Sequence, residues 1–187
     1  INTCPSGRIQ RLINAAEATI EGIEIETRIN ITDQFSIQGS LGYTDAGFDE
    51  FLGFDADGVR GYDPVTDPAA AAALKFERVP ELTYNIMANY FQPLSNGAEI
   101  DFRLAYSYTD DFTNDALGTR AIITDSYGLL DASVSYTFAG SGLKLTVFGK
   151  NITDEDYHDF ALDNALTSLT WGGVPDTYGL RLTYSFE

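Results

Sequence analysis

The sequence predicts an all-β chain: an antiparallel up-and-down meander of about seven strands that forms part of a transmembrane β-barrel. Three observations support this class. Seven segments alternate apolar and polar residues with a period of two, which is typical of strands. Short and long connections alternate between them, as in membrane barrels. The seven apolar faces contain no Asp, Glu, Lys or Arg, as a lipid-facing surface requires.

The end of the chain, residues 177–186, shows the pattern most clearly. Ten residues are about the length of a tilted strand that crosses a bilayer, and aromatic residues stand at both ends of its apolar face. That face consists of Tyr178, Leu180, Leu182, Tyr184 and Phe186. The other predicted strands are about 15–31, 35–44, 82–91, 98–109, 126–138 and 143–150.

The connections predict which segments lie at which end of the sheet. Short turns are expected near 32–34, 93–97 and 139–142, long loops at 45–81 and 151–176, and a medium-long loop at 110–125. The alanine run 69–73 favours a helical turn or two within the first long loop. The alternation changes phase near Glu21 and Gly22, which predicts a β-bulge there.

Composition and the absence of certain motifs argue against several kinds of protein and structural feature. The net charge of −17 argues against a nucleic-acid partner, since phosphates would be repelled. No run of about 18 apolar residues predicts a transmembrane helix. Cys4 is the only cysteine, so no internal disulfide is expected. The sequence contains no H-E-x-x-H, G-x-S-x-G or P-loop motif, and we expect neither an enzyme nor a cofactor.

The odd number of strands predicts that the chain is incomplete, because bacterial single-chain barrels have even strand numbers. Either an eighth strand lies in residues 1–14 or further strands precede Ile1. The start at Ile1, rather than at Met, favours a piece of a longer gene product.

Three segments carry a resemblance to a known family. Residues 21–26 (EGIEIE) are similar to a "G-(V/I)-E-(L/I)-E" strand, and residues 148–157 (FGKNITDEDY) to a "G-(K/R)-N-(L/I)-T-D-x-x-Y" segment. Residues 177–186 look like a closing strand with a terminal aromatic residue. Over about residues 15–186, the chain resembles the C-terminal third of the barrel of a TonB-dependent outer-membrane receptor. It departs from the family pattern in two ways: Glu187 follows Phe186, and the plug and the TonB box are absent.

The resemblance implies a Gram-negative outer-membrane location and a full barrel of about 22 strands around a plug. The receptor would take up a scarce ligand, such as a ferric siderophore, cobalamin or an oligosaccharide, with energy relayed by TonB. Residues 1–187 would then be one C-terminal segment of the barrel wall. Its implied partners are outer-membrane lipid, the rest of the receptor with its plug, TonB through the N-terminal part, and the barrel-assembly machinery through Tyr184 and Phe186.

Candidate site residues lie in the long loops. Asp55, Asp57 and Asp63 offer oxygen ligands for Ca²⁺ but lack the complete twelve-residue pattern, so a solvated acidic loop is the alternative. His158 and Trp171 are candidate ligand-binding residues, with loop packing as the alternative.

Side chains on the polar faces offer a further surface. Six charged residues are expected to contact a plug, line a channel or form salt bridges across the wall: Glu24, Glu26, Arg28, Asp101, Arg103 and Arg181. Two other functions stay open at this point. One is a soluble or surface β-sandwich or small barrel that acts as a binding or structural module, and the other is an outer-membrane channel independent of TonB.

Overall fold

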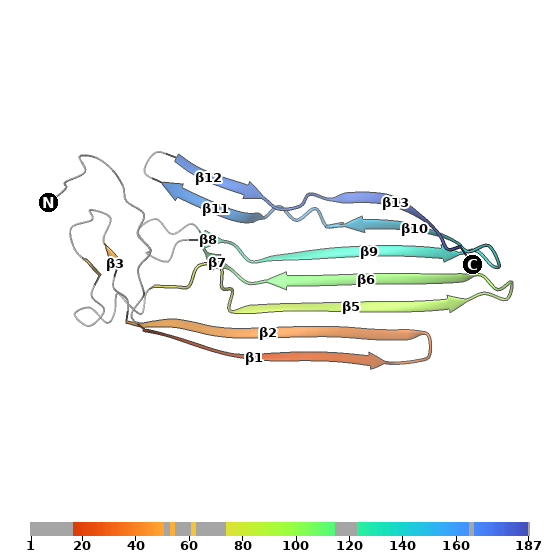
Figure 1. Cartoon of the computed structure of the whole chain (residues 1–187), viewed down its shortest axis with the longest axis horizontal. Coiled ribbons are helices and arrows are strands. Elements are labelled where there is room, and N and C mark those ends of the chain that lie inside the picture. The colour runs from red at the N-terminus through yellow and green to blue at the C-terminus, as the bar shows by residue number, and fades with distance from the viewer. Residues whose placement is uncertain are drawn as a thin grey trace.

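The computed structural model describes residues 17–50, 53–54, 61–62, 74–114, 123–164 and 167–186. Its main feature is a seven-stranded antiparallel sheet with the order β1-β2-β5-β6-β9-β10-β13 (Figure 1). The seven strands are β1 (Glu17–Asn30), β2 (Phe35–Glu50), β5 (Leu82–Pro93), β6 (Glu99–Thr109), β9 (Tyr127–Thr137), β10 (Leu143–Lys150) and β13 (Thr177–Tyr184). The predicted antiparallel meander of about seven strands is confirmed.

Six short strands lie in the connections that the sequence predicts as loops. They form three two-stranded sheets and are β3 (Gly53–Phe54), β4 (Gly61–Tyr62), β7 (Phe112–Thr113), β8 (Ile123–Thr124), β11 (His158–Asn164) and β12 (Thr167–Gly172). The expectation of a plain loop at 151–176 is therefore wrong. The pairing of β11 with β12 shifts between His158 and Phe160, and this irregularity interrupts the period of two that would reveal the hairpin in the sequence.

The strand register places the seven apolar faces on one side of the sheet. Along one row, Ile37 pairs with Ala88, Ala88 with Leu104, and Leu104 with Ala132. The same alternation continues through β10 and β13, where Leu145 pairs with Leu182. Because side chains alternate across a strand, the sheet has one apolar face and one polar face.

The short turns all lie at one end of the sheet and the long connections at the other (Figure 1). In the first turn, the Thr32 hydroxyl accepts hydrogen bonds from the backbone N–H groups of Gln34 (3.2 Å) and Phe35 (3.0 Å). In the third, Gly140 and Gly142 have φ values of 61° and 63°, a conformation that favours glycine. This arrangement matches the expected alternation of short and long connections.

The predicted bulge at Glu21 and Gly22 is wrong. The pairing of β1 with β2 is regular from Ala18 to Asn30, and its register shift lies between Glu17 and Ala18. Glu21 opposes Asp45 on the side of the sheet that carries Ile23, so the apolar face ends there. The change of phase marks the end of the apolar band, and the regular pairing shows that the backbone holds no extra residue there.

Aromatic residues border the apolar band at both ends. Phe35 and Tyr43 are eight residues apart on β2, about 27 Å along the strand, or about 21 Å across a bilayer at a tilt of about 40°. The border near the long connections contains Tyr43, Tyr84, Tyr106, Tyr108 and Tyr178, and the border near the short turns contains Phe35, Tyr90, Phe102, Tyr136 and Tyr184. This spacing approaches the height of a barrel's lipid-facing band, about 25 Å.

The apolar face is uncovered in the described part of the chain. A soluble sandwich would pack a second sheet against it. Instead, Ile23, Ile86 and Leu104 are 61%, 51% and 48% exposed. The buried apolar side chains of the described residues are Leu74, Ala98, Phe112 and Ala161, which lie in turns, loops and short strands. Among the described residues, there is no helix that is long and apolar enough to cross a membrane.

A charge in the middle of the apolar band should destabilise the fold. We expect Leu104→Arg to lower the free energy of unfolding of the intact protein in lipid bilayers by about 2–4 kcal/mol, because the guanidinium faces hydrocarbon. Urea unfolding followed by tryptophan fluorescence measures this change. The matched variant Ser107→Arg, on the polar face of the same strand, should lower the free energy of unfolding by less than about 1 kcal/mol. Equal losses in the two variants would show that the apolar face does not meet lipid.

Candidate functional site

The polar face opposite the apolar band carries as many basic as acidic side chains. The acidic ones are Glu24, Glu26, Glu99, Asp101 and Asp131, and the basic ones are Arg28, Arg103, Lys144, Lys150 and Arg181. The chain as a whole has a net charge of −17. The excess of acidic residues therefore lies outside this part of the sheet, mainly in the connections.

Of the six polar-face residues that were expected to form salt bridges with one another, Asp101 forms one, but its partner is a residue outside that group. Asp101 pairs with Lys144, whose Nζ lies 3.1 Å from Asp101 Oδ2 and reaches across β9 from β10 to β6. The Arg181 guanidinium lies over the Phe148 ring, 5.5 Å from its centroid. In the described part of the chain, no ion pair joins Arg28 or Arg103 to a carboxylate. Both arginines instead line a hollow on the polar face of the sheet.

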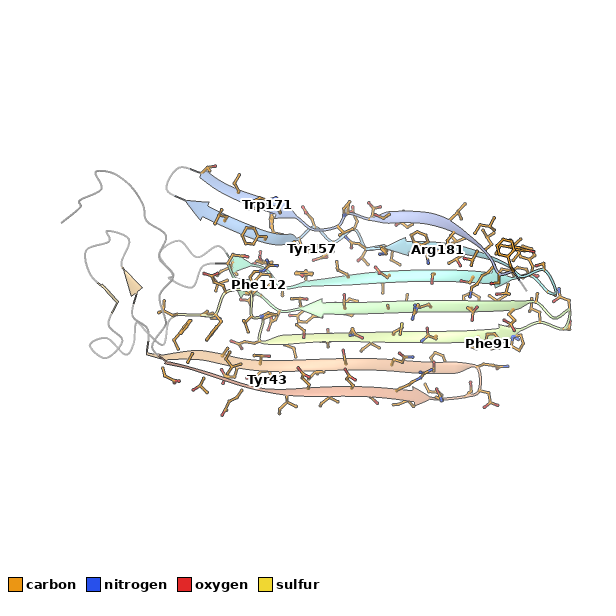
Figure 2. The ribbon with its side chains drawn as sticks, in the orientation of Figure 1. Tyr43, Phe91, Phe112, Tyr157, Trp171 and Arg181 are labelled. Atoms are coloured by element: carbon orange, nitrogen blue, oxygen red, sulfur yellow. The ribbon has the colours of Figure 1, made fainter. Side chains whose placement is uncertain are left out.

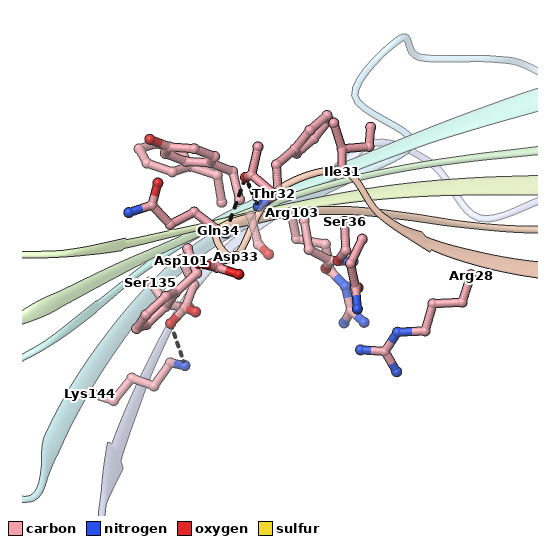
Figure 3. Close-up of a pocket in the computed structure, with 17 residues that line it drawn as sticks. Arg28, Ile31, Thr32, Asp33, Gln34, Ser36, Asp101, Arg103, Ser135 and Lys144 are labelled. Carbon is pink, nitrogen blue, oxygen red and sulfur yellow. Dashed lines mark hydrogen bonds and ion pairs between the residues drawn. The ribbon is translucent and has the colours of Figure 1, made fainter.

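A polar hollow of about 710 Å³ lies on this face near the short turns. Its charged lining residues are Arg28, Arg103, Lys144, Asp33 and Asp101, and hydroxyl and amide side chains such as Ser135 line it as well (Figure 3). A second hollow of about 350 Å³ lies further along the sheet. Its charged lining residues are Arg103, Asp131, Lys150 and Arg181. The charged residues that line the two hollows are five basic and three acidic ones, so the hollowed part of the polar face has a small excess of positive charge.

Asn151 organises the connection between β10 and β13. Its side chain is buried, and its Nδ2 donates to the carbonyls of Glu155 (2.9 Å) and Val174 (3.1 Å). Its Oδ1 accepts from Glu155 N (2.9 Å), and Asp131 Oδ1 accepts from Asn151 N (2.9 Å). Asn151 has a φ of 47°, a conformation that asparagine tolerates better than most residues. One amide thus ties both ends of the β11–β12 hairpin to the sheet.

Tyr157 fixes the base of the same hairpin. Its ring stacks on Tyr127, with centroids 4.2 Å apart, and its hydroxyl accepts from Val174 N at 3.1 Å. The ring fills the space that a Cβ on Gly173 would occupy, so a larger residue there would displace it. Tyr127 belongs to the polar face, because it alternates with Leu129 and Asp131 on β9. Tyr157 therefore lies on the polar side of the sheet.

An apolar and cationic patch covers one face of the hairpin. The Phe160 and Trp171 rings, a cross-strand pair, lie 5.2 Å apart, and the Arg78 guanidinium lies 5.5 Å from the Phe160 centroid. Leu162 pairs with Leu169 two positions further along, hence on the same face. We call these five residues, Arg78, Phe160, Leu162, Leu169 and Trp171, the hairpin patch. Leu162, Leu169 and Trp171 are 43%, 44% and 49% exposed, so the patch presents three exposed apolar side chains on a hairpin outside the main sheet.

The alternation of side chains along β12 indicates on which side of the sheet the hairpin patch lies. Trp171 and Gly173 are two residues apart, so their side-chain positions share a face. Because the Tyr157 ring fills the position of a Gly173 side chain, we infer that Trp171 lies on the same side as Tyr157. On this inference, the hairpin patch continues the polar side of the sheet beyond the end of the apolar band.

Arg78 joins the patch from another connection. Its backbone N–H donates to Thr113 O at 2.8 Å, which links the segment before β5 to β7. Arg78 has a φ of 58°, an uncommon conformation for a residue with a side chain. This backbone bond holds the segment in place while the side chain reaches Phe160. No sequence motif marks Arg78 or Phe160, because their contact depends on how separate connections meet.

The structure places the site residues that the sequence predicts in different parts of the molecule, and some of them lie outside the described residues. Trp171 belongs to the hairpin patch, whereas His158 is exposed at the start of β11, opposite Gly172. Asp55, Asp57 and Asp63 lie outside the described residues, as do 69–73 and the possible strand in 1–14. Within the described ranges, no group of three His, Cys, Asp or Glu side chains has a geometry that would hold a metal ion.

Comparison with solved structures identifies similar folds. The ferric yersiniabactin uptake receptor FyuA from Yersinia pestis superposes with a TM-score of 0.73 at 18% identity, over 93% of this chain and 24% of FyuA. The siderophore receptor PiuA from Acinetobacter baumannii gives 0.68 at 16% identity, over 88% of this chain and 21% of PiuA. The ferric-catecholate import receptor Fiu from K12 E. coli gives 0.63 at 20% identity, over 88% and 20%.

These similarities establish the fold and its extent. The chain spans between 20% and 24% of the length of the three receptors, so it matches a part of each barrel. The predicted fold class, a segment of a transmembrane β-barrel, is confirmed. A family model described as "TonB dependent receptor-like, beta-barrel" matches residues 1–152. Because this match covers most of the 187 residues, the chain belongs to the TonB-dependent receptor β-barrel family.

Proposed function

We propose that this chain is part of the barrel wall of an outer-membrane receptor in a Gram-negative bacterium. The receptor takes up a scarce ligand with energy relayed by TonB. The observation that carries this proposal is the two-faced sheet, which has an uncovered apolar band outside and a charged, hollowed surface on the other side. Membership of a family of transport receptors supports the same conclusion.

The alternative of a soluble binding module fits the structure poorly. Such a module would need a second layer over Ile23, Ile86 and Leu104, and the described part of the chain provides none. A channel independent of TonB would share the apolar band. Family membership favours the TonB-dependent receptor over such a channel.

The rest of the receptor supplies the other partners. In the sheet order, β1 and β13 are the two edge strands, and edge backbone groups in lipid need neighbouring strands. Further strands of a barrel of about 22 would satisfy them, with a plug inside. TonB would act through an N-terminal part of the receptor.

The ligand that we favour is a ferric siderophore, with cobalamin or an oligosaccharide as the alternatives. FyuA, PiuA and Fiu are named as siderophore or ferric-chelate receptors. The hairpin patch offers aromatic rings and a guanidinium at the mouth of the proposed barrel, and His158 stands at the edge of the same hairpin. Aromatic stacking and a cation suit a chelate that carries rings and negative charge.

The last strand is also the proposed signal for barrel assembly. Tyr184 and Phe186 form an edge-to-face pair with centroids 4.7 Å apart, and Phe186 is 89% exposed. The assembly machinery would therefore find an accessible aromatic side chain at this edge of the sheet.

The central prediction concerns uptake. Cells that express the full receptor should accumulate radiolabelled iron from its ferric siderophore, and deletion of TonB should abolish that accumulation. A panel of ferric siderophores, cobalamin and oligosaccharides identifies the ligand class. Accumulation that persists without TonB would contradict the proposed energy coupling and would favour a passive channel.

Removal of the patch tryptophan should weaken ligand binding. We expect Trp171→Ala in the full receptor to raise the dissociation constant about tenfold, because a stacking surface is lost. Equilibrium binding of the ligand to the purified receptor measures the effect. Ile123→Ala, which truncates an apolar side chain of similar exposure outside the patch, should change the constant less than twofold. Unchanged binding by Trp171→Ala would exclude the patch as the ligand surface.

Loss of the terminal aromatic should impair assembly. Phe186→Ala should reduce the folded receptor in the outer membrane several-fold, measured as the heat-modifiable band in gels. Ser185→Ala, the neighbouring truncation on the other face of the strand, serves as the control. Normal levels of the folded Phe186→Ala receptor would argue against a role of this residue in recognition.

A further inference from the structure

We propose that Asn151 and Asp131 are positioning residues for ligand binding, which together hold the hairpin patch in one orientation at the mouth of the proposed barrel. Neither residue touches the ligand in this role. The inference rests on the proposed function, because it requires a ligand that binds the hairpin patch. It adds the two residues on which the shape of that binding surface depends.

The hairpin that carries the patch is not part of the main sheet. β11 and β12 pair with each other in a separate two-stranded sheet, and an isolated hairpin of two strands is only marginally stable. Figure 2 shows Trp171 on this hairpin, beyond the ends of β10 and β13. β11 also contacts β8, and Phe160 meets Arg78, but these partners themselves belong to connections. The two segments that join the hairpin to β10 and β13 must therefore set its orientation.

Asn151 binds both of these segments with one side chain. Its Nδ2 donates to the carbonyl of Glu155 (2.9 Å), three residues before β11, and to that of Val174 (3.1 Å), two residues after β12. Its Oδ1 accepts from Glu155 N at 2.9 Å. Because the side chain is buried, its loss would leave these backbone groups without a partner in a place that water reaches poorly. The two segments are thus held together at the base of the hairpin.

Asp131 in turn connects Asn151 to the main sheet. Asp131 lies on β9, and its Oδ1 accepts from Asn151 N at 2.9 Å. The next residue, Ile152, donates its backbone N–H to the carbonyl of Leu130 at 2.8 Å. Since β10 ends at Lys150, these two bonds continue the contact with β9 past the last residue of the strand. The amide that holds the hairpin therefore has a fixed position relative to the sheet.

The backbone of Asn151 indicates a substitution that isolates its side chain. Asn151 has a φ of 47°, which glycine adopts at no steric cost. Glycine at this position therefore keeps the turn of the chain and removes the amide. Asp154 has a φ of 53° in the same connection and an exposed side chain. Asp154→Gly is thus a matched control with the same gain in backbone freedom.

Hydrogen–deuterium exchange in the full receptor without ligand tests the hold on the hairpin. We expect Asn151→Gly to increase the exchange rate of the backbone amides of β11 and β12 at least about tenfold, because the hairpin opens more often. Asp154→Gly should change these rates less than twofold, and neither variant should alter exchange in β6. Equal exchange in Asn151→Gly and in the unsubstituted receptor would overturn the inference.

Ligand binding gives the second readout. The probe is the compound that the full receptor accumulates best from the panel of ferric siderophores, cobalamin and oligosaccharides. Asn151→Gly should raise its dissociation constant about tenfold, because the patch is no longer held in its binding orientation. Asp154→Gly should raise it less than twofold. Equal losses in the two variants would contradict the inference, since backbone freedom rather than the amide would explain them.

A double variant tests whether Asn151 acts through the patch. If it does, Asn151→Gly combined with Trp171→Ala should bind the probe about as weakly as Trp171→Ala alone. Independent effects would instead multiply to a loss of about a hundredfold. Such a multiplicative loss would contradict a role of Asn151 in positioning the patch.

Substitutions of Asp131 separate its acceptor from its charge. Asp131→Ala removes the acceptor of the Asn151 N–H and should raise the dissociation constant of the probe several-fold. Asp131→Asn retains an amide oxygen that can accept the same hydrogen bond, so most of the lost affinity should return. An equal loss in Asp131→Asn would show that the negative charge matters instead, against the positioning role of Asp131.

These outcomes are separate from those that test the proposed function. Unchanged exchange and binding in Asn151→Gly, in a receptor whose uptake depends on TonB, would overturn the inference and leave the proposed function intact. Conversely, faster exchange and weaker binding in a receptor whose uptake persists without TonB would support the positioning role and contradict the proposed energy coupling. Unchanged binding by Trp171→Ala would exclude the patch as the ligand surface and, with it, this inference.

Discussion

Backbone hydrogen bonding in lipid is the constraint on which the rest of this structure depends. An unpaired N–H or carbonyl in hydrocarbon costs several kcal/mol, so a chain that crosses the bilayer as strands must form a continuous ladder. The seven main strands meet this requirement by pairing each strand with the next one along the chain. Once the ladder and its register are fixed, alternation sends every second side chain outward, and those positions must be apolar.

The same alternation gives the chain its functional surface. The positions between the apolar ones face inward and hold five acidic and five basic residues in the sheet, although the whole chain is strongly acidic. At one end, the connections extend this inner surface into a hairpin that Asn151 and Tyr157 attach to the sheet. The hairpin at the mouth gives this end of the wall its proposed partner, a ligand.

Much of this architecture could be predicted from the sequence, because strand period and connection length are local signals. The strand 143–150 has the predicted bounds, and the apolar faces of all seven strands share one side. The bulge at Gly22 was inferred wrongly because a change of environment, from lipid to the outside, alters the pattern in the same way as a change of backbone. The hairpin patch escaped prediction because Arg78 and Phe160 come from different connections and meet only in three dimensions. The sequence singles out Trp171 because a tryptophan in a loop is conspicuous by itself, and its role in ligand binding stays a prediction.

Residue-by-residue accessibility along β6 tests the central claim most directly. A spin label is placed at each position from 100 to 108 of the full receptor in lipid bilayers, and its collision rates with oxygen and with a polar nickel complex are compared. The two-faced sheet predicts a period of two, with oxygen collisions dominant at Ile100, Phe102, Leu104, Tyr106 and Tyr108. A flat profile, or dominance of oxygen at the odd positions, would contradict a lipid-facing wall.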